Sequence, residues 1–282
     1  MTLRTLLTGL AAGTAVMALS AMSLWPTGGH TGQDRNAPET VRLAPITFQH
    51  RPSGNYTRTG RRADPPLERV TLPALEIMKY QVSSAEYAAC VAARACSPAD
   101  PSAAQARKLA DAPDGAPLPQ TGVSWHDATA YAEWLSRQTG QHWRLPTETE
   151  WQRAAAERFV DDATDLDGTD PAKRWLADYA RNTKAREDSS APLRQRGGYG
   201  ENSLGIADLV GNVWEWTGTC VTRGRIDAEG RIAETEDYCG ARIATGQHRA
   251  QIIDFVRDAR AGGCGAGVPP DNLGFRLVRD RS

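Results

Sequence analysis

The run from Gly205 to Cys220 constrains the fold of this chain more than any other stretch. It alternates apolar and polar residues as a β-strand does, with Val213 and Glu215 on one side and Trp214 and Trp216 on the other. A segment of this kind contributes to the core and to a functional site at the same time.

Oxygen ligands of the kind that calcium prefers occur within the same run. Asp208 and Glu215 flank Gly211, whose backbone can bend close to an ion, and no obvious helix uses the intervening carbonyl groups. Spacing alone leaves two readings open, because short metal patterns recur by accident. The run is either a calcium site or a core strand in which Glu215 is simply a solvated or hydrogen-bonded polar residue.

The composition bounds the class of protein. A chain of 282 residues can bury a full core and admits one large domain or two ordinary ones. Lys and Arg number 33 against 34 Asp and Glu, so the formal net charge of −1 gives no footprint for nucleic acid or an anionic membrane surface. The 26 Gly and 17 Pro indicate a loop-rich protein, and 40% hydrophobic residues exclude wholesale disorder.

The amino-terminal segment predicts export. Arg4 is the only charge in residues 1–25, and the rest of the segment is apolar or small. It is expected to be either a signal peptide, with a small-residue cleavage site before Ala21, or a membrane anchor, since it approaches the length that spans a bilayer. Residues 26–40 read as a linker and residues 41–282 as the folded domain. The protein is therefore expected to be periplasmic, secreted or held at the membrane by this segment.

Five cysteines in an exported chain predict disulfides and one remaining thiol. Cys90 and Cys96 are close enough to close a small loop at the end of a helix, and Cys220 and Cys239 bracket a polar excursion. These two pairs are the predicted bridges. Cys264 is left over as a thiol or replaces one of the four, because connectivity cannot be deduced from sequence alone.

Local patterns predict helices and strands. Helices are expected after Ser83, Ser124 and Thr147, because a hydroxyl side chain there can cap a first turn that precedes an apolar stripe. Strands are expected at residues 41–43, 70–77 and 273–278.

Four motifs occur together in an order typical of one family. They are residues 123–128 (Val-Ser-Trp-His-Asp-Ala), 143–148 (Trp-Arg-Leu-Pro-Thr-Glu), 205–216 and 272–276 (Asn-Leu-Gly-Phe-Arg). With this set the chain resembles the formylglycine-generating enzyme (sulfatase-modifying factor) family over about residues 41–280. The resemblance implies a single α+β domain of C-type-lectin-like type, with little regular secondary structure and bound calcium.

The resemblance also implies which residues bind calcium. The family's ligands fall on the side chains of Asp208 and Glu215 and on the backbone carbonyls of Gly211 and Val213. A second calcium site is implied at Asn182 and Thr183, where no acidic ligand can be placed.

The catalytic part of the family is missing. Family enzymes that oxidise a sulfatase cysteine bind copper(I) with a thiol pair, and the two positions are Ala250 and Phe255 here. Neither side chain ligates copper or forms a thiolate, so copper and formylglycine generation are not expected. Trp214, His248 and Cys264 are the candidates for another chemistry. The alternative is a hydrogen-bonded or surface role for His248 and a structural role for Cys264.

A narrower resemblance joins the export segment, residues 248–250 and residues 257–264. These stretches are similar to NirV-type proteins found with copper nitrite reductases, which implies an accessory role in denitrification in the periplasm. The leading hypothesis is an exported accessory protein that supports the maturation or function of a periplasmic partner protein or peptide, such as a copper nitrite reductase. The alternative hypothesis is a periplasmic oxidase of a small molecule or peptide that uses a non-thiol or single-thiol site.

Overall fold

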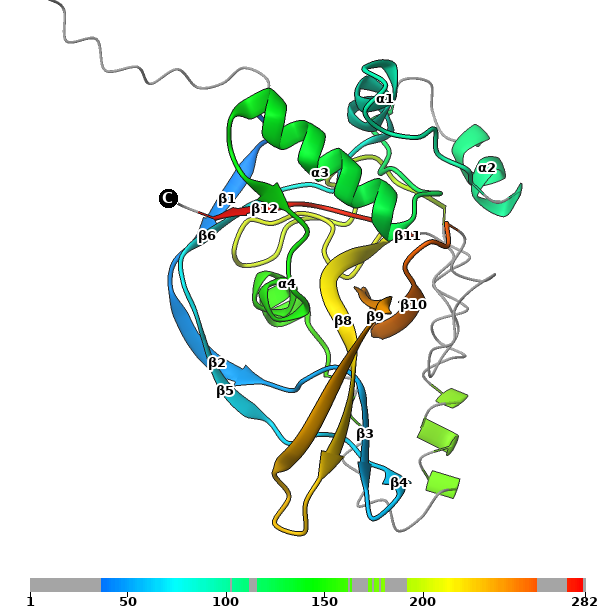
Figure 1. Ribbon diagram of the computed structural model, residues 1–282. Helices are drawn as coiled ribbons and strands as arrows, with labels where there is room; N and C mark the ends of the chain where they lie inside the picture. The colour runs from blue at the N-terminus through cyan, green and yellow to red at the C-terminus, as the bar shows by residue number, and fades with distance from the viewer. Residues whose placement is uncertain are drawn as a thin grey trace, which may run out of the picture. The chain divides into compact units, whose positions relative to one another are not determined.

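Three β-sheets and a set of helices build the part of the chain that the computed structural model describes, which is residues 37–101, 103–111, 116–161, 163, 172–173, 175–177, 179–180, 192–257 and 273–280 (Figure 1). The expected mixed α+β class is confirmed. Helices in this part are α1 (Ser84–Ala92), α2 (Ala103–Ala110), α3 (Trp125–Thr139), α4 (Glu148–Ala155) and the short 3-10 helix η1 (Ala156–Arg158). No helix among these residues is long and apolar enough to cross a membrane, and the expected export segment lies outside them.

A four-stranded sheet joins the two ends of the domain. Its order is β1 (Thr40–Leu43), β6 (Leu75–Met78), β12 (Val278–Asp280) and β7 (Trp143–Arg144). The strand expected at residues 70–77 is divided, because Pro73 has no N–H to donate to a ladder. Its first half is β5 (Glu68–Leu72), which pairs with β2 (Ile46–His50) in a separate two-stranded sheet. The expectation of one continuous strand was wrong.

The strand expected at residues 273–278 is also divided. Its two ends are β11 (Leu273–Gly274), which runs parallel to the start of β8 (Trp214–Ile226), and β12, which lies in the four-stranded sheet. The residues between them pass from one sheet to the other. This crossing carries Arg276 into the interior, where it is fully buried.

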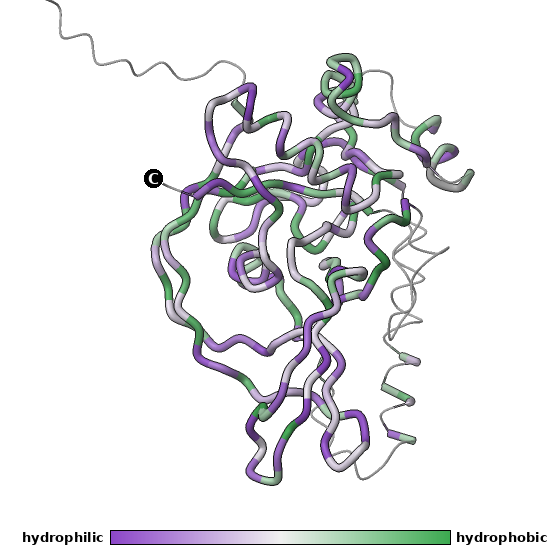
Figure 2. The backbone as a smooth tube through the Cα atoms, in the orientation of Figure 1, coloured by the Kyte–Doolittle hydropathy of each residue, from purple (hydrophilic) through white to green (hydrophobic). Residues whose placement is uncertain are grey.

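A long hairpin dominates the third sheet. Its strands are β8 and β9 (Ile232–Thr245), flanked by β10 (Arg249–Ile253) on one side and by β3 (Asn55–Arg58) and β4 (Arg61–Arg62) on the other. The outer half of the hairpin is mainly hydrophilic and exposed, whereas the inner half enters the core (Figure 2). Of the run Gly205–Cys220 that was expected to be a strand, only the part from Trp214 onward is one, the inner half of β8; residues 205–213 form turns and bends instead, with left-handed backbone conformations at three non-glycine positions.

Capping and disulfides follow the sequence predictions. Ser83, Ser124 and Thr147 each cap a helix, and each forms a reciprocal capping box with the acidic residue three positions later. The bridges Cys90–Cys96 and Cys220–Cys239 are present and confirm the predicted pairing. Cys264 lies outside the described residues.

The two larger of the three hydrophobic clusters among the described residues form most of the core. One lies under α1 and α3 and contains Tyr87, Tyr131, Trp216 and Phe275. The other packs α4 against the four-stranded sheet through Trp151, together with Leu75, Ile77 and Val278. Because β8 enters the core between them, both Glu215 and Trp216 on its two faces are fully buried.

Candidate functional site

A bent loop leads into β8 and shapes the predicted site. Asp208, Val210 and Asn212 adopt left-handed backbone conformations, with φ of 61°, 63° and 66°. Asp and Asn tolerate this region, but a β-branched Val does so only at a cost of about 1–3 kcal/mol. The surrounding structure therefore holds this loop in place.

A buried ion pair between Arg276 and Glu215 lies at the centre of the site. The Nε and one terminal nitrogen of Arg276 donate to the two carboxylate oxygens of Glu215 at 2.7 and 2.8 Å, and both side chains are buried. The remaining N–H groups of Arg276 donate to three backbone carbonyls, those of Met78, Lys79 and Ala207, at 2.9–3.2 Å. All five donors of the guanidinium are thereby used.

Two further side chains complete the hydrogen bonds of Glu215. Trp151 on α4 donates its indole N–H at 2.8 Å, and Gln81 donates its amide Nε2 at 2.8 Å. The same Gln81 nitrogen lies 3.3 Å from the carbonyl of Asp208 and 3.4 Å from that of Gly211. Glu215 thus joins α4, the bent loop, the segment after β6 and the crossing before β12.

Three of the predicted calcium ligands, Asp208, Gly211 and Glu215, already have hydrogen-bond donors. The Asp208 carboxylate accepts from the backbone N–H groups of Gly197 at 2.7 Å and Tyr199 at 2.9 Å. Calcium needs six to eight oxygen ligands with available lone pairs. In this arrangement the charge of Glu215 is balanced by a guanidinium, and the convergent carbonyls face the amide of Gln81, so the residues do not fit a calcium ion. Calcium at Asp208, Gly211, Val213 and Glu215 stays a prediction.

The candidates for another chemistry are partly brought together. Trp214 and His248 meet edge to face, with ring centroids 4.3 Å apart, and His248 is buried. Gly246 lies directly over the indole, since a Cβ there would come within 2.6 Å of a Trp214 ring atom. Cys264, the third candidate, lies outside the described residues, as do Asn182 and Thr183 of the second calcium prediction.

The two former thiol positions differ in their surroundings. Ala250 is buried on β10, where it pairs with Ala244 of β9. Phe255 follows β10 and is 68% exposed. The four cysteines in the described part of the chain are all in disulfides, so these residues offer no thiolate at either position.

Sequence reasoning missed Arg276, Gln81 and Trp151 as the residues that hold Glu215. A signal was present for Arg276, because a charged residue inside the apolar run Leu-Gly-Phe-Arg-Leu-Val requires a buried counter-charge. A second pair, His50 with Glu148 at 2.7 Å, was missed because these buried residues lie 98 positions apart.

We expect Arg276→Met to lower the free energy of unfolding by about 3–5 kcal/mol, because it leaves the Glu215 carboxylate buried without its counter-charge. The double variant Arg276→Met with Glu215→Leu should lower the free energy of unfolding by much less than the sum of the decreases in the two single variants. Denaturant unfolding measures these changes. Arg231→Met, which breaks an exposed pair with Asp227, is the control and should cost less than about 1 kcal/mol. A loss that small for Arg276→Met would contradict the prediction.

The melting temperature also tests the calcium prediction. Because Arg276 already neutralises Glu215, we expect neither EDTA nor added calcium to change it. If calcium bound the folded state, a free calcium concentration 100 times the Kd would stabilise it by about 2.7 kcal/mol and raise the melting temperature by several degrees. Such a rise would contradict the arrangement with Arg276 and favour the sequence prediction.

Comparison with known proteins shows the family to which the chain belongs. The sequence model described as "Sulfatase-modifying factor enzyme 1-like domain" matches residues 29–281. The chain is 31% identical over 173 residues to the mouse protein named inactive C-alpha-formylglycine-generating enzyme 2, which covers 57% of this chain and 49% of that protein. It is 36% identical over 112 residues to the formylglycine-generating enzyme of Streptomyces coelicolor, which covers 35% of this chain and 31% of that enzyme.

The chain thus spans about half the length, or less, of these curated relatives. Among solved structures, PvdO from Pseudomonas aeruginosa has a similar fold, with a TM-score of 0.53 and 21% identity over 88% of this chain and 96% of that one. The matched region includes β8, Arg276 and both former thiol positions. The chain belongs to the family with the sulfatase-modifying factor enzyme 1-like domain.

Proposed function

We propose that this protein is an exported accessory protein that uses the family scaffold to bind a partner protein or peptide and does not generate formylglycine. The observation that carries the proposal is the replacement of the copper-binding thiols by Ala250 and Phe255 beside an intact scaffold. Copper(I) needs soft thiolate or thioether ligands, and neither a methyl group nor a phenyl ring supplies one. The similarity to the mouse relative that is named inactive also supports the proposal that this protein does not generate formylglycine.

The surface around Phe255 supports a binding role. The backbone N–H of Asp254 donates to the Gly240 carbonyl at 3.2 Å, so the ladder between β9 and β10 continues to the residue before Phe255. Tyr238, two residues before Gly240, is 56% exposed. Phe255 follows β10 and Tyr238 lies within β9, and exposed aromatic side chains are enriched in protein contact surfaces.

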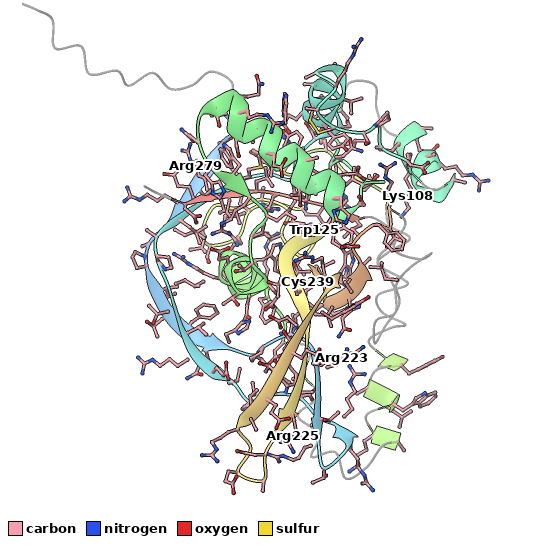
Figure 3. All side chains as sticks on the ribbon, viewed as in Figure 1. Lys108, Trp125, Arg223, Arg225, Cys239 and Arg279 are labelled. Atoms are coloured by element: carbon pink, nitrogen blue, oxygen red, sulfur yellow. A yellow bond between two sulfur atoms is a disulfide. The ribbon has the colours of Figure 1, made fainter. Side chains whose placement is uncertain are left out.

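A rigid frame lies next to these aromatic residues. Trp125, labelled in Figure 3, is the first residue of α3. The guanidinium carbon of Arg242 lies 3.9 Å from the centroid of the Trp125 ring, and the Trp125 backbone N–H donates to the backbone carbonyl of Asp254 at 2.9 Å. Arg257, two residues after Phe255, is held by two hydrogen bonds to Asp127 of α3 at 2.8 and 2.9 Å. These contacts fix the backbone on both sides of Phe255, which reduces the entropy lost when a partner binds.

The finer proposal concerns the partner and the compartment. We propose a periplasmic partner, a copper nitrite reductase, whose maturation or function the protein supports. The resemblance of residues 248–250 and 257–264 to NirV-type proteins motivates this choice. The two disulfides agree with an oxidising compartment.

A second candidate function is an oxidase of a small molecule or peptide. The contact between Trp214 and His248 favours it, because an indole beside a buried imidazole can hold and protonate an organic substrate. The variant His248→Gln separates the two functions. It should abolish an oxidase activity and leave partner binding unchanged.

The purified protein should neither bind copper(I) stoichiometrically nor convert a cysteine-containing peptide to formylglycine. The double variant Ala250→Cys with Phe255→Cys should gain copper(I) binding, because it restores two soft ligands at the family positions. Competition with a chromophoric copper(I) chelator measures the affinity, and Phe255→Cys alone is the control. Stoichiometric copper in the unmodified protein would contradict the proposal.

Partner binding should depend on the exposed aromatic residues. We expect Phe255→Asp to weaken binding to a co-purified copper nitrite reductase by at least about tenfold, because it removes an exposed apolar anchor. Biolayer interferometry measures this affinity. The matched control is Leu67→Asp, which places the same charge at an apolar residue that is 51% exposed in the loop before β5. Equal losses for both variants would contradict a specific role for Phe255.

A further inference from the structure

A mainly apolar cavity lies between the β1–β2 connection and the end of α4. Its volume is about 560 Å³, within the range of small-molecule sites, roughly 300–1,000 Å³. Ile46 and Phe48 of β2 form one wall, and Phe159 and Leu204 form another. Ile46 and Leu204 are 43% and 39% exposed, so the opening of the cavity is itself apolar.

Positive charge without a carboxylate faces this cavity. Arg153 on α4 lines it and is only 7% exposed. Its terminal nitrogens donate to the backbone carbonyls of Pro73, at 2.9 Å, and of Ala44. Burial lowers the pKa of the Arg153 guanidinium, although an arginine remains charged at neutral pH. The charge of Glu150 acts on this guanidinium in the opposite direction to burial, but the Glu150 carboxylate is itself held by both terminal nitrogens of Arg144 at 2.7 and 2.8 Å.

A second arginine stands on the same wall. Arg42 of β1 is exposed and lines the cavity. Arg42 lies opposite Glu76 of β6, whose carboxylate accepts from Arg279, and within the described residues no ion pair joins a carboxylate to Arg42 or Arg153. Two of the five N–H groups of Arg153 are used by the two carbonyls, which leaves donors for an anion.

Within the described residues, a buried polar atom beside the cavity lacks a hydrogen bond. The Oε1 atom of Gln152, next to Arg153 on α4, is buried and makes no hydrogen bond within the described residues. Gln152 also lines the cavity. A buried polar group that lacks a hydrogen bond is rare in folded proteins, because its desolvation is not compensated. Either orientation of the amide offers a polar contact to a bound molecule.

We propose that this cavity binds a small amphipathic carboxylate, an anion with an unbranched or compact apolar body. The apolar body lies against Ile46, Phe48 and Phe159, and the carboxylate lies between Arg42 and Arg153. A purely apolar ligand would leave the buried guanidinium without an anion. A polyphosphate has no apolar group that could be buried against the apolar walls. This site is separate from the partner surface at Phe255 and does not depend on the proposed accessory function.

Decanoate, kept below its micellar concentration, is the probe for this site. Isothermal titration calorimetry on the full chain should show saturable binding of one decanoate. Decanol should bind at least about tenfold more weakly, because it lacks the charge that pairs with the guanidinium groups. Decyltrimethylammonium, with the same chain and the opposite charge, should not bind. Absent binding of decanoate, or equal affinity for decanol, would overturn the proposal.

Two pairs of variants locate the binding. Arg42→Gln and Ile46→Asp should each weaken decanoate binding by about tenfold or more, by removing a positive charge or by adding a negative one. Arg61→Gln on β4 and Leu67→Asp are the matched controls on exposed residues that do not line the cavity. None of the four residues makes the hydrogen bonds that hold α4, so all four variants should fold. Decanoate binding that survives both cavity variants would overturn the proposal.

Discussion

The ion pair between Arg276 and Glu215 is the interaction on which the rest of this domain depends. Its cost is large, since both charges leave water, and it is offset only because every donor and acceptor is used. The pair ties the crossing between two sheets to the first residues of β8. It also connects α4, through Trp151, to the bent loop that begins at Asp208. The network thereby fixes the arrangement of the loops and short strands around the long β8–β9 hairpin.

The hydrogen-bond network around Glu215 does not include the positions at which the family resemblance implies copper ligands. Glu215 and Trp216 are buried by contacts that involve none of the family's copper ligands. The thiol positions lie on β10 and after it, where Ala250 fills a strand position and Phe255 faces solvent. Neither Ala250 nor Phe255 takes part in the hydrogen bonds that hold Glu215. The apolar cavity beside Arg153 lies in another part of the same domain, and neither Tyr238 nor Phe255 lines it.

Local chemistry made much of the fold predictable. The capping boxes at Ser83 and Thr147 depend on residues three positions apart, and the bridge Cys90–Cys96 closes a short loop. Such features need no knowledge of distant contacts. The prediction of one strand across Pro73 was wrong because the two halves pair with different distant strands: β5 pairs with β2, and β6 pairs with β1. Propensity indicates that a segment is extended, but pairing decides to which sheet it belongs.

The sequence by itself determined the family, both described disulfides and the burial of the run that ends in Glu215 and Trp216. It did so because each of these is written in residue identity or short spacing. Only the tertiary structure decided what neutralises Glu215, since Arg276 lies 61 positions away and Gln81 lies 134 positions away. It alone brought Arg42, Gln152 and Arg153 to one apolar cavity. Ion pairs and cavities form between segments that are distant in the chain, so their geometry exists only after the domain has folded.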